Sequence, residues 1–371
     1  MKLRFLGLIG SLTLLALSAG LASAQPFTFS KNYKVQAGPT SVAAGSLKND
    51  GYADIVVANY TKGTISVLLN NRDGSGTFGA ATNYIVGTNP HAVVLGDFTG
   101  DNFSDIAVAN VGGGVSILIN NGSGAFTQPH TAFAAGSQPF ALAVGAFKDG
   151  AKDLVVLNEN AGYTILLGHK TSGIPDGTFT TLSSVALTGR SPTSVAVGHF
   201  TATGTHQDLA IADMKGAVIT LQGSGTGTFG SPVTIATPPR PYAIVDHDFG
   251  NGFDNLVVTD YGSNVYILKN VGGGVFQQSS FPVGQIPSSV DVGRFDGDNK
   301  LDIVVANSFD GTLTFLPGAG MAVFSLGGNT KSHGTLPGSV VAAGSFRGPG
   351  SKDDIAVANY GDNNVSVFFG Q

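Results

Sequence analysis

The stretch 96-GDFTGDNFSDIAVAN-110 decides the fold, because versions of it return seven times along the chain. A segment similar to 92-AVVLGDF-98 comes first in each copy, and a loop and a second apolar run follow. Self-similarity at intervals of 47 to 55 residues is typical of repeat architectures. The second runs read DIVVAN, DIAVAN, DLVVLN, DLAIAD, NLVVTD, DIVVAN and DIAVAN, and they begin at Asp54, Asp105, Asp153, Asp208, Asn255, Asp302 and Asp354.

Each copy contains four short apolar or alternating runs bounded by Gly, Asn and Asp. In the second copy these runs are residues 92–98, 105–110, 114–120 and 131–135. Short runs rich in Val and Ile between turn residues indicate β-strands. Four strands in a repeat of this length are typical of one propeller blade. We therefore predict an all-β, seven-bladed β-propeller of four-stranded antiparallel blades.

The two ends of the chain indicate how the ring closes. The seventh copy ends after its third strand, residues 364–370, and lacks a fourth. The stretch 27-FTFSKNYKVQAGP-39 resembles 78-FGAATNYIVGTNP-90, which carries a fourth strand, so we expect the N-terminal strand to complete the last blade. Closure would remove the open sheet edges of a linear array. The predicted single domain is 25–371, with blades at 39–89, 90–138, 139–191, 192–240, 241–286, 287–336 and 337–371 plus 27–38.

Composition excludes several classes of protein. Charged residues make up 12% of the 371 positions, while 42% are apolar, which excludes a disordered chain. Every acidic residue except Glu159 is Asp, and Asp favours turns whereas Glu favours helix interiors. The chain has no Cys, which excludes disulfides, thiolate metal sites and a Cys nucleophile.

Residues 1–24 have the pattern of a secretory signal peptide. Lys2 and Arg4 precede an apolar run over 5–21, and 22-ASA-24 is a small-residue cleavage site. The alternative is an uncleaved anchor, because 5–24 gives 20 uncharged residues. Cleavage would leave 17 basic and 24 acidic residues, a net charge of 17 − 24 = −7. We expect a secreted protein, periplasmic or extracellular, with no membrane span after cleavage and no nucleic-acid partner, which would need a basic patch.

The motif 96-GDFTGDNFSDI-106 resembles the FG-GAP/VCBS repeat, found in the integrin α-subunit head and in secreted bacterial propellers. Eroded versions occur in all seven copies, so the resemblance covers 25–371. It implies the propeller fold. Propellers of this family serve in adhesion, in carbohydrate binding and as accessory domains of enzymes, and the fold does not choose among these.

The resemblance also implies calcium in the loop between the first and second strands of a blade, the 1–2 loop. Alternate oxygens in a tight turn converge on one point, which suits a hard cation. The other interpretation is that these Asp residues form turns by accepting backbone N–H bonds. In the sixth copy Arg294 occupies the first ligand position, where its charge opposes a cation. The candidate ligands are Asp97, Thr99, Asp101, the Phe103 carbonyl and Asp105 in the second copy, and Asp296, Asp298 and Asp302 in the sixth.

The opposite face should carry the loops between second and third strands (2–3 loops) and the connections between blades (4–1 connections). Aromatic residues with polar neighbours on one face are typical of a binding surface for a sugar ring or a partner's loop. The other interpretation, which we favour from the sequence, is that these residues pack each turn on the next blade. The candidates are Tyr60, Tyr261, Phe309 and Tyr360 in 2–3 loops, and His91, Phe140, Tyr242 and Arg240 in 4–1 connections.

These observations predict a secreted, monomeric, non-enzymatic binding or adhesion module with structural Ca²⁺ and an extracellular protein or glycan ligand. The sequence shows no nucleophile elbow and no His-paired Ser, and we assign no catalytic residue. Two alternatives stay open. One is a lectin-like propeller, and the other is a polysaccharide lyase or hydrolase on the same scaffold, since many Asp residues lie at unknown separations.

Overall fold

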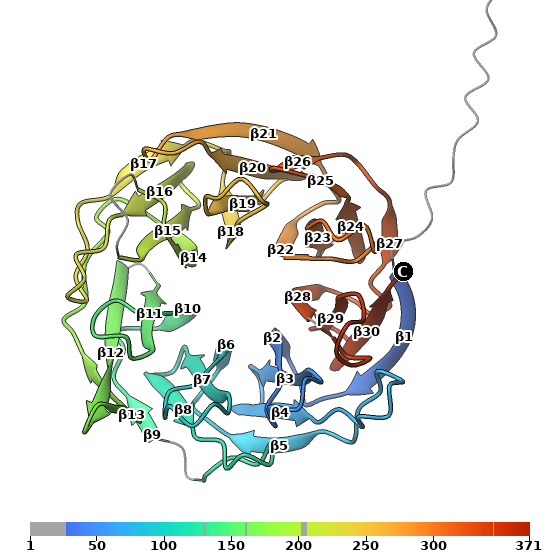
Figure 1. Ribbon diagram of the computed structural model, residues 1–371, viewed down its shortest axis with the longest axis horizontal. Helices are drawn as coiled ribbons and strands as arrows, with labels where there is room; N and C mark the ends of the chain where they lie inside the picture. Colours follow the sequence, from blue (N-terminus) through green and yellow to red (C-terminus); the bar gives the residue numbers. More distant parts are fainter. Residues whose placement is uncertain (1–26, 129–130, 160–161, 202–205, 344) are drawn as a thin grey trace, which may run out of the picture.

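The protein is a closed ring of seven four-stranded antiparallel sheets in a computed structural model (Figure 1). The structure describes residues 27–128, 131–159, 162–201, 206–343 and 345–371. The predicted signal peptide, 1–24, lies outside these residues. Within the described ranges no helix is long and apolar enough to cross a membrane.

Each blade runs outward from the axis, with its first strand innermost. The innermost strands are β2 (Pro39–Gly45), β6 (Pro90–Gly96), β10 (Pro139–Gly145), β14 (Pro192–Gly198), β18 (Pro241–His247), β22 (Pro287–Gly293) and β28 (Pro337–Ala343). The second strands are β3 (Asp54–Asn59), β7 (Asp105–Asn110), β11 (Asp153–Asn158), β15 (Asp208–Asp213), β19 (Asn255–Asp260), β23 (Asp302–Asn307) and β29 (Asp354–Asn359). Blades are numbered 1 to 7 in this order.

The outer half of each blade is more varied. The third strands are β4 (Thr64–Leu68), β8 (Val115–Leu118), β12 (Gly162–Thr171), β16 (Ala217–Leu221), β20 (Asn264–Asn270), β24 (Thr312–Leu316) and β30 (Asn364–Gly370). The fourth strands are β5 (Thr82–Ile85), β9 (Thr131–Phe133), β13 (Ile174–Thr181), β17 (Val233–Ala236), β21 (Phe276–Pro282), β27 (Asn329–Lys331) and β1 (Phe27–Lys34). Blade 6 also carries a small hairpin, β25 (Gly318–Gly320) with β26 (Val323–Phe324), which the sequence analysis did not predict.

The burial of the second strands explains why each is a continuous apolar run between its terminal Asp or Asn residues, without alternation of apolar and polar residues. All six residues of every second strand are buried. Neighbouring blades cover both faces of the strand, so both sets of side chains need to be apolar. Seven hydrophobic clusters result, one between each pair of neighbouring blades. Each blade is thus stabilised mainly by contact with its neighbours.

The predicted closure is confirmed. Strand β1 pairs with β30 from Phe27 opposite Gly370 to Lys34 opposite Asn364. The Phe27 ring packs edge-on against Phe295 of blade 6, with centroids 5.1 Å apart. On the other side, Tyr33 packs against Phe78 of blade 1 at 5.3 Å. The N-terminal strand therefore contacts both neighbouring blades as well as its own.

Candidate functional site

The first residue of each second strand holds the 1–2 loop in place. In blade 2, one Asp105 oxygen accepts from the Phe98 N–H at 2.9 Å and the other from the Asn120 N–H at 2.8 Å. Asp302 makes the same two bonds in blade 6, to the N–H groups of Phe295 and Gly318. An unpaired buried N–H is costly. This Asp therefore has a structural role whether or not a cation is present.

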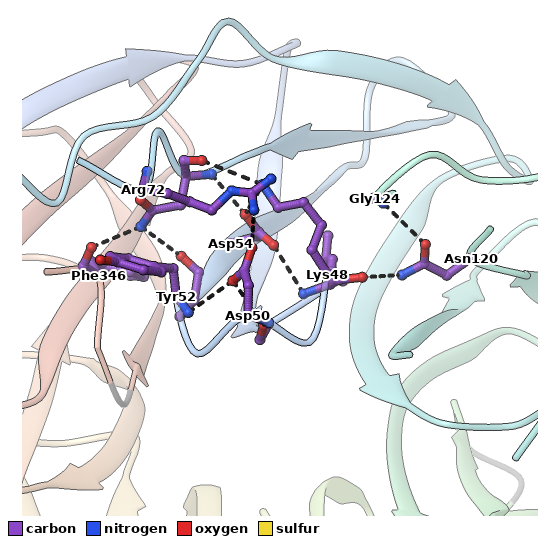
Figure 2. Close-up of polar contacts among 12 residues, drawn as sticks. Lys48, Asp50, Tyr52, Asp54, Arg72, Asn120, Gly124 and Phe346 are labelled. Carbon is purple, nitrogen blue, oxygen red and sulfur yellow. Dashed lines mark hydrogen bonds and ion pairs between the residues drawn. The ribbon is translucent and has the colours of Figure 1, made fainter. Parts of the chain in front are cut away.

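Blades 1 and 7 place a basic side chain beside this buried carboxylate. Lys48 Nζ lies 3.7 Å from Asp54 Oδ1, with the two side chains 11% and 0% exposed (Figure 2). In blade 7, Arg347 Nη2 lies 2.7 Å from Asp354 Oδ1. Lys48 and Arg347 each directly follow the buried Leu or Phe of the loop, where blade 2 has Thr99. These two blades neutralise the buried carboxylate with a residue of their own.

Blades 2 and 6 have no such side chain, and burial dominates the pKa values there. Desolvation raises the pKa of Asp105 to about 6, and the carboxylates of Asp101 and Asp97 raise it further. Desolvation likewise raises the pKa of Asp302 to about 6, with a smaller contribution from the Asp296 charge. Both loops thus hold a buried carboxylate close to at least one other carboxylate.

The two loops differ in how their remaining carboxylates are arranged. Asp97 accepts backbone N–H bonds from Gly100, Asp101 and Asn102, as the turn-forming interpretation predicted. In blade 6, one oxygen from each of Asp296, Asp298 and Asp302 lies within 4.8 Å of the others, and this is the one such acidic group among the described residues.

Three basic side chains adjoin the blade 6 group. One is Lys352 of blade 7, whose Nζ donates to the Asp296 carbonyl at 3.4 Å. Arg294, the residue at the first ligand position, bonds within its own loop, because its Nε donates to the Asn299 carbonyl at 3.3 Å. Lys300 Nζ lies 3.2 Å from Asp298 Oδ2 on the exposed side of the loop. Among the described residues, the carboxylate oxygens therefore converge in blade 6, whereas the residues of blade 2 fit the sequence motif better.

On the opposite face, the Asn residues that end the second strands are buried and hydrogen-bonded, and Asn110 of blade 2 also accepts from the Gly87 N–H of blade 1 at 3.0 Å. Asn110 Nδ2 donates to Ser116 Oγ at 3.0 Å, and Asn307 Nδ2 donates to Thr314 Oγ1 at 2.9 Å. These bonds tie the second strand to the third and, at Asn110, to the preceding blade.

The same face has a pocket of about 520 Å³ on the ring axis, which we call the axial pocket. Both residues that follow the proline of every innermost strand line it, so all seven blades contribute. Of the predicted ligand residues, Tyr60, His91 and Tyr242 line the pocket, together with Phe140. Val111, Glu159 and Met214 also line it, and sequence reasoning missed them. They directly follow the last residue of a second strand, as Tyr60 does, and this shared position was the available signal.

His91 lies at the centre of an aromatic group in this pocket. The centroids of Tyr60 and Phe140 both lie 6.2 Å from the His91 ring, in edge-to-face contacts. His91 Nδ1 lies 2.7 Å from the Phe140 carbonyl, which can only accept, so Nδ1 carries the proton. Burial lowers the pKa of His91, while the Phe140 carbonyl and the charge of Glu159 act in the other direction.

Three predicted ligand residues lie outside the axial pocket. Tyr261 packs against Tyr242 at 5.5 Å, and the Arg240 guanidinium lies 4.5 Å from the Tyr261 ring centroid. Phe309 is 68% exposed and Tyr360 41% exposed. They flank Leu336, which is 53% exposed in the connection between blades 6 and 7.

Two hydrogen bonds join the segments that carry these exposed side chains. The Tyr360 N–H donates to the Leu336 carbonyl at 3.1 Å, and Ser308 Oγ, next to Phe309, donates to the Pro337 carbonyl at 2.9 Å. We call Phe309, Leu336 and Tyr360 the apolar rim.

A separate pocket of about 270 Å³ lies at the end of the innermost strand β18, where Asp246 and His247 line it. Desolvation raises the pKa of Asp246 to about 6, and the charge of Asp254 adds to this effect. His247 and His199 oppose it. Because the folded pKa lies above the ordinary 3.8, stability from this group is present below pH 3.8 and is lost as the pH rises through about 6.

We therefore expect Asp246→Asn to stabilise the protein at pH 7.5, where wild type carries a buried charge. The expected gain in unfolding free energy is about 1–3 kcal/mol, and it should disappear near pH 4. Urea unfolding at both pH values measures it. Asp248→Asn, two residues further on and exposed, is the matched control and should change little at either pH. A gain of equal size at both pH values would show that charge is not the cause.

Comparison with known proteins bears on the fold. Residues 47–108 match the model of the FG-GAP-like repeat. A search of curated protein sequences gave no significant match. Similar solved structures include BBS1N in complex with ARL6DN, with a TM-score of 0.65, 13% identity and coverage of 93% of this chain and 97% of that one.

Two bacterial proteins have comparable similarity. The BP39L lectin from Burkholderia pseudomallei has a TM-score of 0.66 at 14% identity, covering 90% of this chain and 95% of that one. Virginiamycin B lyase from Staphylococcus aureus has a TM-score of 0.63 at 12% identity, covering 92% and 99%. At these identities the likeness concerns the fold alone. The repeat match over residues 47–108 and the ring of four-stranded sheets together identify the chain as a seven-bladed β-propeller that contains an FG-GAP-like repeat.

Proposed function

We propose that this protein is an exported, monomeric, non-enzymatic binding module that contacts an extracellular ligand through the face carrying the axial pocket and the apolar rim. The observation that carries the proposal is the apolar rim, three large exposed side chains gathered on the face where the sequence predicted ligand contacts. Cleavage after Ala24 would leave β1, which begins at Phe27, intact for ring closure.

The backbone conformation of Leu336 is shared around the ring. Leu336 has a φ of 51°, in the left-handed region, and the equivalent residues before the first strands of blades 1, 2, 3, 5 and 6 also have positive φ: Gly38, Asn89, Gln138, Arg240 and Ile286. The turn before the first strand therefore belongs to the fold, and it is the exposure of Leu336 that supports a role for the rim.

The ligand experiment compares two faces of the ring. Wild type and two variants are applied to arrays of matrix proteins and glycans. Phe309→Ser with Leu336→Asn should weaken binding about tenfold or more, the size expected for truncating two anchors, without lowering the melting temperature. Phe253→Ser, an exposed Phe in a 1–2 loop on the other face, should bind as wild type does. The proposal would be contradicted if both variants bound the array ligand equally well, or if wild type bound no ligand on the arrays.

A lectin is the second candidate, favoured by the aromatic and hydroxyl side chains of the axial pocket, and the glycan arm of the array tests it. The enzyme alternative is tested by incubating polysaccharides with the protein. Release of reducing sugar or of an unsaturated product would contradict a non-enzymatic role.

We further propose that structural Ca²⁺ binds in the 1–2 loop of blade 6 through Asp296, Asp298 and Asp302. Three carboxylate oxygens that lie close together, one of them from the buried Asp302, suit a hard cation. Lys300, which pairs with Asp298, would have to move aside when the ion binds. The affinity expected for an extracellular module is about 10⁻⁴–10⁻³ M.

Millimolar Ca²⁺ added to chelator-treated protein should therefore raise its melting temperature by about 2–4 °C. Asp298→Asn should remove this shift, and Asp101→Asn in blade 2 should keep it. The reverse pattern would assign the ion to blade 2, and an absent shift in wild type would exclude both loops.

A further inference from the structure

The axial pocket is acidic and has no basic side chain in its walls. Glu159, the single Glu of the chain, is the one lining residue with a full charge at neutral pH. Burial lowers the pKa of His91, which favours the neutral imidazole, although the Phe140 carbonyl and the Glu159 charge oppose this. The Glu159 charge acts on the His91 ring, so the carboxylate lies within electrostatic reach of the aromatic group.

The position of Glu159 relative to these rings is set by the backbone. The Glu159 N–H donates to the Gln138 carbonyl at 3.1 Å, two residues before Phe140. Phe140, His91 and Tyr60 then follow one another in edge-to-face contact. A carboxylate in one pocket with aromatic rings attracts a cation by its own charge, and the negative faces of the rings add to that attraction.

The pocket walls carry many hydroxyl groups. Three of them donate to carbonyls of the next blade: Thr40 to Pro90, Thr193 to Pro241 and Ser288 to Pro337, at 3.2, 3.2 and 2.9 Å. Three others, Ser41, Ser194 and Ser339, accept backbone N–H bonds from Val93, Ile244 and Val42. A ligand that donates hydrogen bonds finds the Glu159 carboxylate and hydroxyl oxygens in these walls.

We propose that the axial pocket binds an alkylammonium group, with Glu159 as its counter-ion and Tyr60, Phe140 and Tyr242 as its walls. This deepens the proposed function, since it names the chemistry of the group that the binding face takes from its ligand. The ammonium group has two sources, a free small amine or a lysine side chain of a polypeptide.

Calorimetric titration separates these sources. The probes are tetramethylammonium, N-acetyl-lysine amide and a lysine-containing peptide, with tert-butanol, N-acetyl-norleucine amide and the norleucine peptide as neutral equivalents. We expect the cations to bind and their neutral equivalents not to bind. Tight binding of tetramethylammonium alone indicates a small amine, and preference for the peptide indicates a side chain.

Glu159→Gln should weaken cation binding about tenfold or more. Asp310→Asn, a carboxylate in the 2–3 loop of blade 6 outside the pocket, should leave cation binding unchanged. Equal binding of neutral and charged probes, or full binding by Glu159→Gln, overturns the assignment. A third result is that the cations do not bind while the Phe309→Ser, Leu336→Asn variant still loses binding to its array ligand. That result would show that the assignment of an ammonium site is wrong, and the proposed function would stand.

Discussion

Removal of residues 25–34 is expected to abolish the cooperative unfolding transition and to produce aggregated protein. The deletion takes away β1, with its seven paired residues, and exposes the β30 edge. It also removes Phe27 and Tyr33, which are 4% and 6% exposed. Truncating a buried aromatic side chain alone costs about 3–5 kcal/mol. Two such losses approach the whole stability of a typical protein, about 5–15 kcal/mol.

Thermal melting and size-exclusion chromatography measure this result. The matched control begins at Gln25, so that it loses the predicted signal but keeps β1, and it should melt cooperatively as a monomer. The single variant Phe27→Ala should lie between the two, with a loss of about 3–5 kcal/mol. A chain beginning at Val35 that melts like the control would contradict closure by the N-terminal strand.

Lys48→Met should cost about 3–5 kcal/mol at neutral pH, because it leaves Asp54 buried without a cation. Asp54 accepts backbone N–H bonds from Leu47 and Asn70, and burial already raises its pKa although Lys48 opposes this. Without Lys48 the pKa should rise further, so the loss should shrink as the pH falls. Urea unfolding at pH 7.5 and pH 4.5 measures both effects.

Blade 5 suggests the rescue for this variant. Its equivalent residue is Asn255, whose Oδ1 accepts from the Asn270 N–H at 3.0 Å and whose amide donates to the His247 carbonyl. Lys48→Met with Asp54→Asn should therefore recover much of the lost stability. Lys62→Met, an exposed Lys of the same blade, should stay within about 0.5 kcal/mol of wild type. If Lys48→Met is as mild as this control, the pair does not stabilise blade 1.

The ring and its closure were predictable because they depend on repeated, local signals. Each second strand is a continuous apolar run between Asp or Asn residues, and the N-terminal stretch resembles a fourth strand directly. The hairpin β25–β26 was not predictable. Its residues, 318–324, are mostly Gly, Ala and Met without alternation, and the pairing depends on the packing of Phe324 against Phe249 of blade 5.

The sequence predicted on which face of the ring the candidate site lies, but not which residues make it up. Tyr60, His91 and Tyr242 were placed on the binding face, and the structure brings them to one pocket. Glu159 shares with Tyr60 the position directly after a second strand, but its place in the axial pocket emerges only when the seven blades converge on the axis. The buried Asn residues show the converse, since a polar residue at the start of a loop can belong to the core.

The most direct test of the closed ring is a disulfide between β1 and β30, in a chain that has no Cys of its own. Asn32 lies opposite Ser366, and Ser366 Oγ donates to Asn32 Oδ1 at 2.7 Å. Asn32→Cys with Ser366→Cys should therefore form an intramolecular disulfide under mild oxidation. Asn32→Cys with Val367→Cys, one residue out of register and on the other face of the sheet, should form it poorly. Rapid crosslinking of the first pair alone, detected by mass spectrometry, is the predicted result; two free thiols in the first pair, or equal crosslinking of both, would contradict the closed ring.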